Sequence, residues 1–212
     1  MIIGPDAALI SELVGAGGDD VLVLKKGSAR GANGNDWVYV LNAGASVSGG
    51  NGDDHIFGSP GDDYNTLSGN GGVDYVYGLG GNDRIVGAGG DFIFGGDGDD
   101  TVASNSNGGN TLSGGSGSNQ FNINESSDPN NKRTTIQDFQ LETGNIIEFR
   151  KNELTICYFV VTYDEAQTAG CNADVLYAEY FDDVMTLFND VPNEDAVQCW
   201  TLQTTPECLA AI

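Results

Sequence analysis

The stretches GGNGDDHIF at residues 49–57 and GGDGDDTVA at residues 95–103 follow one nine-residue pattern. In both, glycines stand at positions 1, 2 and 4, an aspartate at position 6 and an aliphatic residue at position 8. Alignment of the rest of the sequence to this pattern places further units near residues 15, 24, 31, 40, 58, 69, 78, 87, 104 and 114. The units at 24, 40 and 104 are degenerate. Recurrence at a short period predicts an architecture of stacked, equivalent turns.

The residue types of the unit predict a tight turn followed by a short strand. Glycine permits backbone angles that are closed to other residues, and the last three residues would form a strand whose central side chain points inward. One such strand cannot bury its own face, so successive turns must stack to build a core. The inward positions are apolar throughout: Leu22, Val38, Val47, Ile56, Leu67, Val76, Ile85, Ile93, Val102, Leu112 and Phe121. The pattern therefore predicts an all-β fold.

Composition marks the limits of the repeat region. Residues 15–123 contain 29 of the 32 glycines and 13 aspartates but no glutamate. Beyond Asn124 glycine becomes rare and glutamate returns. We therefore expect an N-terminal cap at residues 1–14, the repeat domain at 15–123 and a separate C-terminal capping or interaction segment at 124–212.

The charge of the chain excludes several classes of partner. With 31 acidic and 8 basic residues, the formal net charge is −23. Nucleic acids and anionic membrane surfaces are themselves polyanions, so neither is expected to bind. No run of about 18 apolar residues is present, so no membrane span is expected. The first 15 residues are too short and too acidic for a secretory signal, which indicates a mature form or another export route.

The repeats resemble the hemolysin-type (RTX) calcium-binding nonapeptide family over about residues 15–123. The resemblance implies a right-handed parallel β-roll, a β-solenoid in which two units form one turn and several Ca²⁺ ions lie between turns stacked on the same side. One side would carry Asp20, Asp36, Asp54, Asp74 and Asp91, and the other Asp63, Asp83, Asp100 and Asn119. Each calcium would bridge two of these side chains and complete its shell with glycine carbonyls, in keeping with its preference for oxygen ligands. Neighbouring aspartates would repel one another without calcium, so folding is expected to depend on the ion.

One outer face of the roll is predicted to be aromatic. Beside the inward residues of one side stand two outward columns, formed by Trp37, His55, Tyr75 and Phe92 and by Tyr39, Phe57, Tyr77 and Phe94. The comparable positions of the other side are mainly polar. An apolar surface of this size is rarely left in water. Either residues 125–212 fold back over it, or it contacts a second copy or a glycan.

The segments around the repeats carry less specific signals. Residues 134–149 resemble the strand-turn-strand that closes RTX rolls, with Ile136, Phe139, Ile146, Ile147 and Phe149 covering the last edge. Residues 154–163 are β-rich, while the spacing of apolar residues in 173–190 and in 6–14 predicts helices. The C-terminal segment is thus expected to be β-rich or α+β.

Four cysteines, Cys157, Cys171, Cys199 and Cys208, all lie in the C-terminal segment. Their spacing contains no CxxC pair, which argues against a zinc site. An even number favours two disulfides and an oxidising compartment, although four reduced thiols remain an alternative.

No catalytic motif accompanies the repeats. The chain has one histidine, so a two-histidine zinc site is impossible, and neither HExxH nor GxSxG occurs. We expect no enzyme but an extracellular or cell-surface structural or adhesive protein, folded by calcium and self-associating into a filament, surface layer or matrix. Alternatives are a monomeric calcium-folding module for secretion or display, and a glycan-binding module that uses the aromatic face.

Overall fold

The computed structural model describes residues 2–3, 12–105, 109–124, 134–138, 144–151, 155–163, 176–181, 184–189 and 200–204. These residues form strands and turns, and no helix occurs among them. Within the same ranges, no helix therefore has the length and apolar character that a membrane crossing requires.

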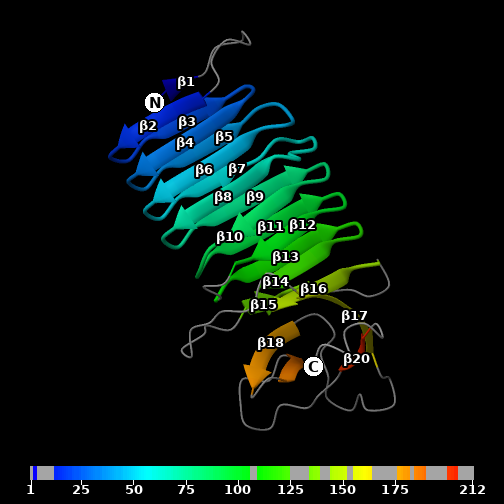
Figure 1. Cartoon of the computed structure of the whole chain (residues 1–212). Helices are drawn as coiled ribbons and strands as arrows, with labels where there is room; N and C mark the ends of the chain where they lie inside the picture. Colours follow the sequence, from blue (N-terminus) through cyan, green and yellow to red (C-terminus); the bar gives the residue numbers. More distant parts are fainter. Residues whose placement is uncertain are drawn as a thin grey trace.

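The strands alternate between two sheets of ten strands each. The first sheet, sheet A, contains β1 (Ile2–Ile3), β3 (Val21–Leu24), β5 (Trp37–Val40), β7 (His55–Phe57), β9 (Tyr75–Gly80), β11 (Phe92–Asp97), β13 (Thr111–Ser116), β15 (Thr134–Ile136), β18 (Leu176–Phe181) and β19 (Val184–Asn189). The second, sheet B, contains β2 (Glu12–Gly17), β4 (Ser28–Asn33), β6 (Ser46–Asn51), β8 (Thr66–Gly71), β10 (Arg84–Gly87), β12 (Thr101–Ser104), β14 (Gln120–Asn124), β16 (Ile146–Lys151), β17 (Thr155–Tyr163) and β20 (Trp200–Thr204). Because odd and even strands alternate up to β16, each pair of consecutive strands makes one turn of a β-solenoid (Figure 1).

The register aligns equivalent residues of successive turns. Strand β9 pairs with β11 in parallel, and Val76 lies beside Ile93. Strand β10 pairs with β12 in the same way, with Ile85 beside Val102. The predicted all-β parallel roll is therefore confirmed.

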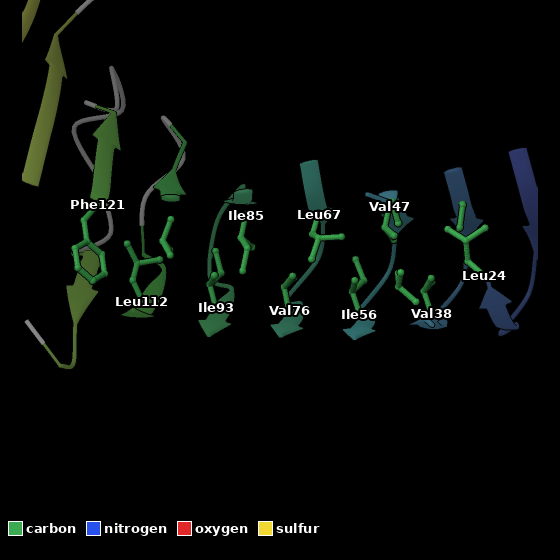
Figure 2. Close-up of a cluster of buried hydrophobic side chains, with 14 of the residues drawn as sticks. Leu24, Val38, Val47, Ile56, Leu67, Val76, Ile85, Ile93, Leu112 and Phe121 are labelled. Carbon is green, nitrogen blue, oxygen red and sulfur yellow. The ribbon is translucent and has the colours of Figure 1, made fainter. Parts of the chain in front are cut away.

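The core is a column of side chains between the two sheets. All eleven predicted inward residues are buried, with exposed fractions of 0–2%. Figure 2 shows the labelled side chains of this column pointing toward one another from opposite sheets, with Val47 of β6 and Ile56 of β7 as neighbouring examples. Their burial, at roughly 1.5–3 kcal/mol for a Val, Leu or Ile side chain, supplies the apolar stabilisation that a single short strand lacks.

The segment after the repeats continues both sheets. Strands β15 and β16 pair in parallel with β13 and β14, and Ile136 and Ile147 extend the core with exposed fractions of 1% each. Ile146 instead points outward and is 40% exposed, because adjacent residues of a strand face opposite sides. Its predicted covering role is thus wrong; Phe149 lies on β16, and Phe139 lies outside the described residues.

Antiparallel strands follow at the C-terminal end of the roll. Strand β18 pairs with β15 and β17 pairs with β16, both in antiparallel orientation. The β-rich run predicted at 154–163 is confirmed as β17. Figure 1 places β17, β18 and β20 beyond the last parallel turn.

The two predicted helices are wrong wherever the structure describes them. Residues 176–181 and 184–189 form the antiparallel pair β18 and β19, in which Phe181 lies opposite Val184. Only two residues separate these strands, and such short connections suit a hairpin. At the other end, residues 12–14 belong to β2, where Leu13 is buried and lies beside Ala29 of β4. In both segments strand pairing overrides a short apolar pattern that is compatible with either structure.

The predicted cysteine pairing falls largely outside the described residues. Cys157 lies on β17, whereas Cys171, Cys199 and Cys208 are not among the residues described. The two disulfides therefore stay a prediction.

Candidate metal centre

The acidic residue of each unit shares a face with the core. Asp54 stands two residues before the buried Ile56, and Asp83 stands two residues before Ile85. Because side chains alternate along an extended chain, a residue two positions before an inward residue also points inward. Asp54 is 0% exposed and Asp83 is 3% exposed, so the turns bury these carboxylates at the rim of the hydrophobic core.

Sheet A carries the first column of inward carboxylates. In every turn the backbone N–H of one aspartate donates to Oδ1 of the aspartate one turn further on. The donor–acceptor distances are 2.8 Å from Asp20 to Asp36, 2.8 Å from Asp36 to Asp54, 2.8 Å from Asp54 to Asp74 and 3.0 Å from Asp74 to Asp91. The structure thus brings together the five aspartates that the sequence assigned to one side.

Sheet B carries the second column. The N–H of Asp63 donates to Asp83 at 2.7 Å, that of Asp83 to Asp100 at 2.8 Å, and that of Asp100 to Oδ1 of Asn119 at 2.9 Å. This column begins one turn earlier, where Ala45 offers only its N–H, which donates to Asp63 at 3.0 Å. Asp63, Asp83, Asp100 and Asn119 are therefore also placed together as expected.

Sequence reasoning missed two members of these columns. The N–H of Asp91 donates to Oδ1 of Asn110 at 2.9 Å, and that of Asn119 donates to Oδ1 of Asn145 at 2.7 Å. Both asparagines are at most 5% exposed. Their spacing could have identified them, because Asn110 stands two residues before the buried Leu112 and Asn145 stands two residues before the buried Ile147. Neither asparagine, however, belongs to a well-formed nonapeptide.

The second carboxylate oxygen of most column aspartates has no protein partner. Within the described part of the chain, the buried Oδ2 atoms without a hydrogen bond belong to Asp36, Asp54, Asp74, Asp83 and Asp100. Oδ2 of Asp63 differs, since it accepts the N–H of Ser59 at 2.8 Å, and Oδ2 of Asp91 accepts the N–H of Ala88 at 2.7 Å. A buried carboxylate oxygen without a partner is energetically costly unless another group neutralises it.

Backbone carbonyl oxygens lie close to the unpartnered Oδ2 atoms of Asp36, Asp54, Asp83 and Asp100. A Cβ added to Gly31 would lie 2.1 Å from Oδ2 of Asp36 and 2.6 Å from the carbonyl oxygen of Gly49, one turn further on. At Gly95 the same construction meets Oδ2 of Asp100 at 2.3 Å and another glycine carbonyl oxygen at 2.5 Å. Glycine is thus required at the first position of the unit because carboxylate and carbonyl oxygens occupy the space that a side chain would need.

The pKa values of the column aspartates report the same electrostatic cost. Burial raises the pKa of Asp74 and of Asp83 from 3.8 to about 7, with repulsion from neighbouring carboxylates as a further cause. Burial likewise raises the pKa of Asp54 and of Asp100 to about 6. At neutral pH ionisation of these buried carboxyl groups costs free energy, and a bound cation would lower that cost by stabilising the carboxylate form.

The asparagines in the columns separate hydrogen bonding from charge. Asn110 and Asn119 accept the same N–H hydrogen bond through Oδ1 as the aspartates do. The series of N–H to Oδ1 hydrogen bonds between successive turns, called the ladder below, therefore needs no carboxylate. Their amide nitrogens have protein acceptors: Nδ2 of Asn110 donates to Ser104 Oγ at 2.8 Å, and Nδ2 of Asn119 donates to the carbonyl oxygen of Gly115 at 3.3 Å. The aspartates therefore carry a negative charge that the fold does not use, and calcium, which binds hard oxygen ligands, fits it.

The donor set limits the kind of metal site. No group of three or more His, Cys, Asp or Glu side chains that could hold a metal occurs among the residues described. A site in these turns must therefore combine one or two carboxylates with backbone carbonyls. Such an all-oxygen set suits calcium and disfavours zinc, which prefers nitrogen and sulfur ligands in protein sites.

The aromatic residues lie on the outer face of sheet A, as the sequence predicted. The first row runs through Trp37, His55, Tyr75 and Phe92, and the second through Tyr39, Phe57, Tyr77 and Phe94. These eight residues are called the aromatic double row below. Trp37 is 41% exposed, and the other seven are partly exposed. The outer face of sheet B is mainly polar at the equivalent positions, for example Ser46 and Ser48 of β6.

Fold and columns together define a parallel β-solenoid whose turns bury rows of aspartates. The RTX calcium-binding nonapeptide repeat family matches residues 42–64, 65–91 and 86–106 in four copies. This part of the chain therefore consists of RTX calcium-binding repeats. Comparison with curated proteins finds no match, and comparison with solved structures finds none either.

Proposed function

We propose that the chain is an extracellular, calcium-folded structural protein, whose roll forms when calcium neutralises the inner aspartate columns, and that the loaded roll self-associates. The observation that carries the proposal is the set of five buried Oδ2 atoms without a hydrogen bond in Asp36, Asp54, Asp74, Asp83 and Asp100. Asparagines fill the same register without that cost, so the carboxylates are best explained as calcium ligands.

The proposed extracellular location of the protein rests on the calcium that its repeats bind. RTX repeat proteins are typically secreted and bind calcium outside the cell. Extracellular calcium modules work at dissociation constants of about 10⁻⁴–10⁻³ M, and such affinities leave a protein unloaded in the cytosol. A chain with a net charge of −23 would then stay unfolded until it met calcium.

A structural role is favoured over catalysis by the use of the inward polar groups. The aspartates of both columns are taken up by the hydrogen bonds between turns and by the proposed ions. The regular turns instead build an elongated scaffold with one aromatic and one polar face.

The test is a calcium titration followed by far-UV circular dichroism. We expect an unfolded spectrum in chelator and a β spectrum in millimolar calcium, with magnesium at the same concentration far less effective because it dehydrates reluctantly and demands octahedral geometry. A circular dichroism spectrum that is the same in chelator and in calcium would contradict the proposal.

A further inference from the structure

The aromatic double row consists of face-to-face stacks along the axis of the roll. In the first row the ring centroids are 4.3 Å apart between Trp37 and His55, 5.0 Å between His55 and Tyr75, and 4.8 Å between Tyr75 and Phe92. In the second row the three spacings are 5.0, 5.0 and 4.9 Å. The spacing matches the distance of about 4.7–4.9 Å between hydrogen-bonded strands, so the backbone sets it.

Stacking decides which part of each ring meets the solvent. The planes of successive rings differ by only 2–12°, so the faces of the inner rings are covered by their neighbours in the row. The outward surface therefore consists of ring edges. A glycan would need free ring faces to stack on, and the inner rings offer none.

The double row is also a neutral strip on a strongly acidic molecule. The outward residues of the flanking strands are Val21 and Val23 of β3 and Thr111 and Ser113 of β13. None of these residues, and none in the double row, is an acid, a lysine or an arginine, although the chain carries a net charge of −23. Two copies of this chain could therefore meet on this face without opposing the carboxylates of one copy to those of the other.

The described strands of the C-terminal segment do not cover this face. They extend the two sheets beyond β15 and β16 by edge pairing, and Figure 1 places β17, β18 and β20 at the end of the roll. The reading in which this segment folds back over the aromatic residues is therefore not supported by its described strands.

From these observations we infer that the aromatic double row is the docking surface for a second copy of this chain, packed face to face about a two-fold axis. A partner sheet with the same spacing between successive rings places its ring edges against those of the first along the whole strip, and this chain supplies such a sheet. Two rows of four rungs each match one another after a two-fold rotation, as an isologous contact requires. Sheets that pack in this way lie about 10 Å apart.

The size of the strip sets the strength of the contact. Four rungs at strand spacing extend for less than about 20 Å, so the strip is smaller than the roughly 800 Å² per partner of a standard interface. The dimer is therefore weak and depends on concentration. It also depends on calcium, because the rows exist only in the folded roll; in this respect the inference rests on the proposed function.

Sedimentation velocity over a concentration series in millimolar calcium tests this surface, with circular dichroism on the same samples. Wild-type protein is expected to shift from monomer to dimer as its concentration rises. Tyr75→Glu puts like charges at the two-fold contact and should weaken association about tenfold or more. Ser48→Glu places the same charge on the polar face of sheet B and should leave association unchanged, while Tyr75→Phe keeps the ring edge and should also dimerise.

The outcomes separate the inference from the function on which it rests. A calcium-folded wild type that stays monomeric at millimolar concentration overturns the docking surface but leaves calcium-dependent folding intact. Association that survives Tyr75→Glu, or that Ser48→Glu abolishes, overturns it as well, because the contact would then lie elsewhere. Failure of the proposed function shows instead as the absence of any calcium-dependent change in circular dichroism. If Tyr75→Glu fails to fold in calcium, His55→Glu, in the same row, is the replacement variant with the same expected loss of association.

Discussion

Replacement of Asp54 by asparagine should change the stability of the roll in opposite directions with and without calcium. Oδ1 of Asp54 accepts the N–H of Asp36 at 2.8 Å, and an asparagine keeps this bond, as Asn119 does for Asp100. Oδ2 of Asp54 is buried and has no hydrogen-bond partner. The substitution therefore removes a buried charge and a proposed calcium ligand but leaves the ladder in place.

The magnitude follows from the pKa of Asp54. Burial, together with the charges of Asp36 and Asp53, raises this pKa from 3.8 to about 6. At 1.36 kcal/mol per pKa unit the shift corresponds to at most about 3 kcal/mol, and solvent screening at the rim of the roll reduces it to roughly 1–2 kcal/mol. We expect Asp54→Asn to stabilise the metal-free roll by about that amount at neutral pH, and to lose a similar or larger part of the stabilisation by calcium.

The adjacent residue provides the matched control. Asp53 is exposed, and its Oδ1 accepts the N–H of Val73 at 2.9 Å, which is the same kind of bond across one turn. Asp53→Asn changes the net charge equally and should leave both stabilities within about 0.5 kcal/mol. Urea unfolding in calcium measures the stability of the loaded roll. In chelator, where wild type is expected to be unfolded at neutral pH, the concentration of a stabilising osmolyte that produces the β spectrum measures the stability of the metal-free roll. Equal calcium stabilisation of Asp54→Asn and wild type would refute the reasoning.

Three further predictions concern pH, strain and the asparagine positions. The pKa values of Asp74 and Asp83 rise from 3.8 to about 7 on folding, so the metal-free roll is most stable below about pH 4 and loses this stability as the pH rises toward about 7. Circular dichroism in chelator should therefore show more β structure at about pH 5 than at pH 8. The reverse order would contradict the assignment of the raised pKa values. Leu79 has a positive φ of 79° at the position where the perfect units have glycine. Leu79→Gly should therefore stabilise the calcium-loaded roll by about 1 kcal/mol. As a control, Leu41 has no positive φ, so Leu41→Gly should destabilise the roll. Asn119→Asp should destabilise the metal-free roll by roughly 1–2 kcal/mol and increase its stabilisation by calcium, while a carboxylate at the exposed Ser118 should do neither.

The columns and the core were predictable because their signals repeat. An aspartate two residues before an aliphatic residue recurs with glycines in fixed phase, and the backbone of a stacked turn leaves such a pair one orientation. Asp36 and Val38 illustrate this, since both are 0% exposed. The aromatic rows followed from the same phase, because residues on either side of an inward position must point outward.

The parts that were not predictable depend on local geometry or on pairing partners. Which carboxylates lack a partner could not be read from the repeat, because Ser59 and Ala88 satisfy Asp63 and Asp91 only through the particular shape of two irregular turns. Asn110 was missed because the unit that should contain it is degenerate. The strands at 176–181 and 184–189 were taken for a helix because a short apolar pattern fits both structures until strand pairing decides between them.

The most direct test of the account is the number of calcium ions bound at equilibrium, measured by equilibrium dialysis. Wild-type protein is compared with a variant in which the five aspartates with unpartnered Oδ2 atoms are replaced by asparagine. We expect wild type to bind several ions and to be unfolded in chelator, and we expect the variant to bind few or none yet to show a β spectrum in chelator. A variant that binds as many ions as wild type would contradict the claim that the inner columns hold the calcium and couple it to folding.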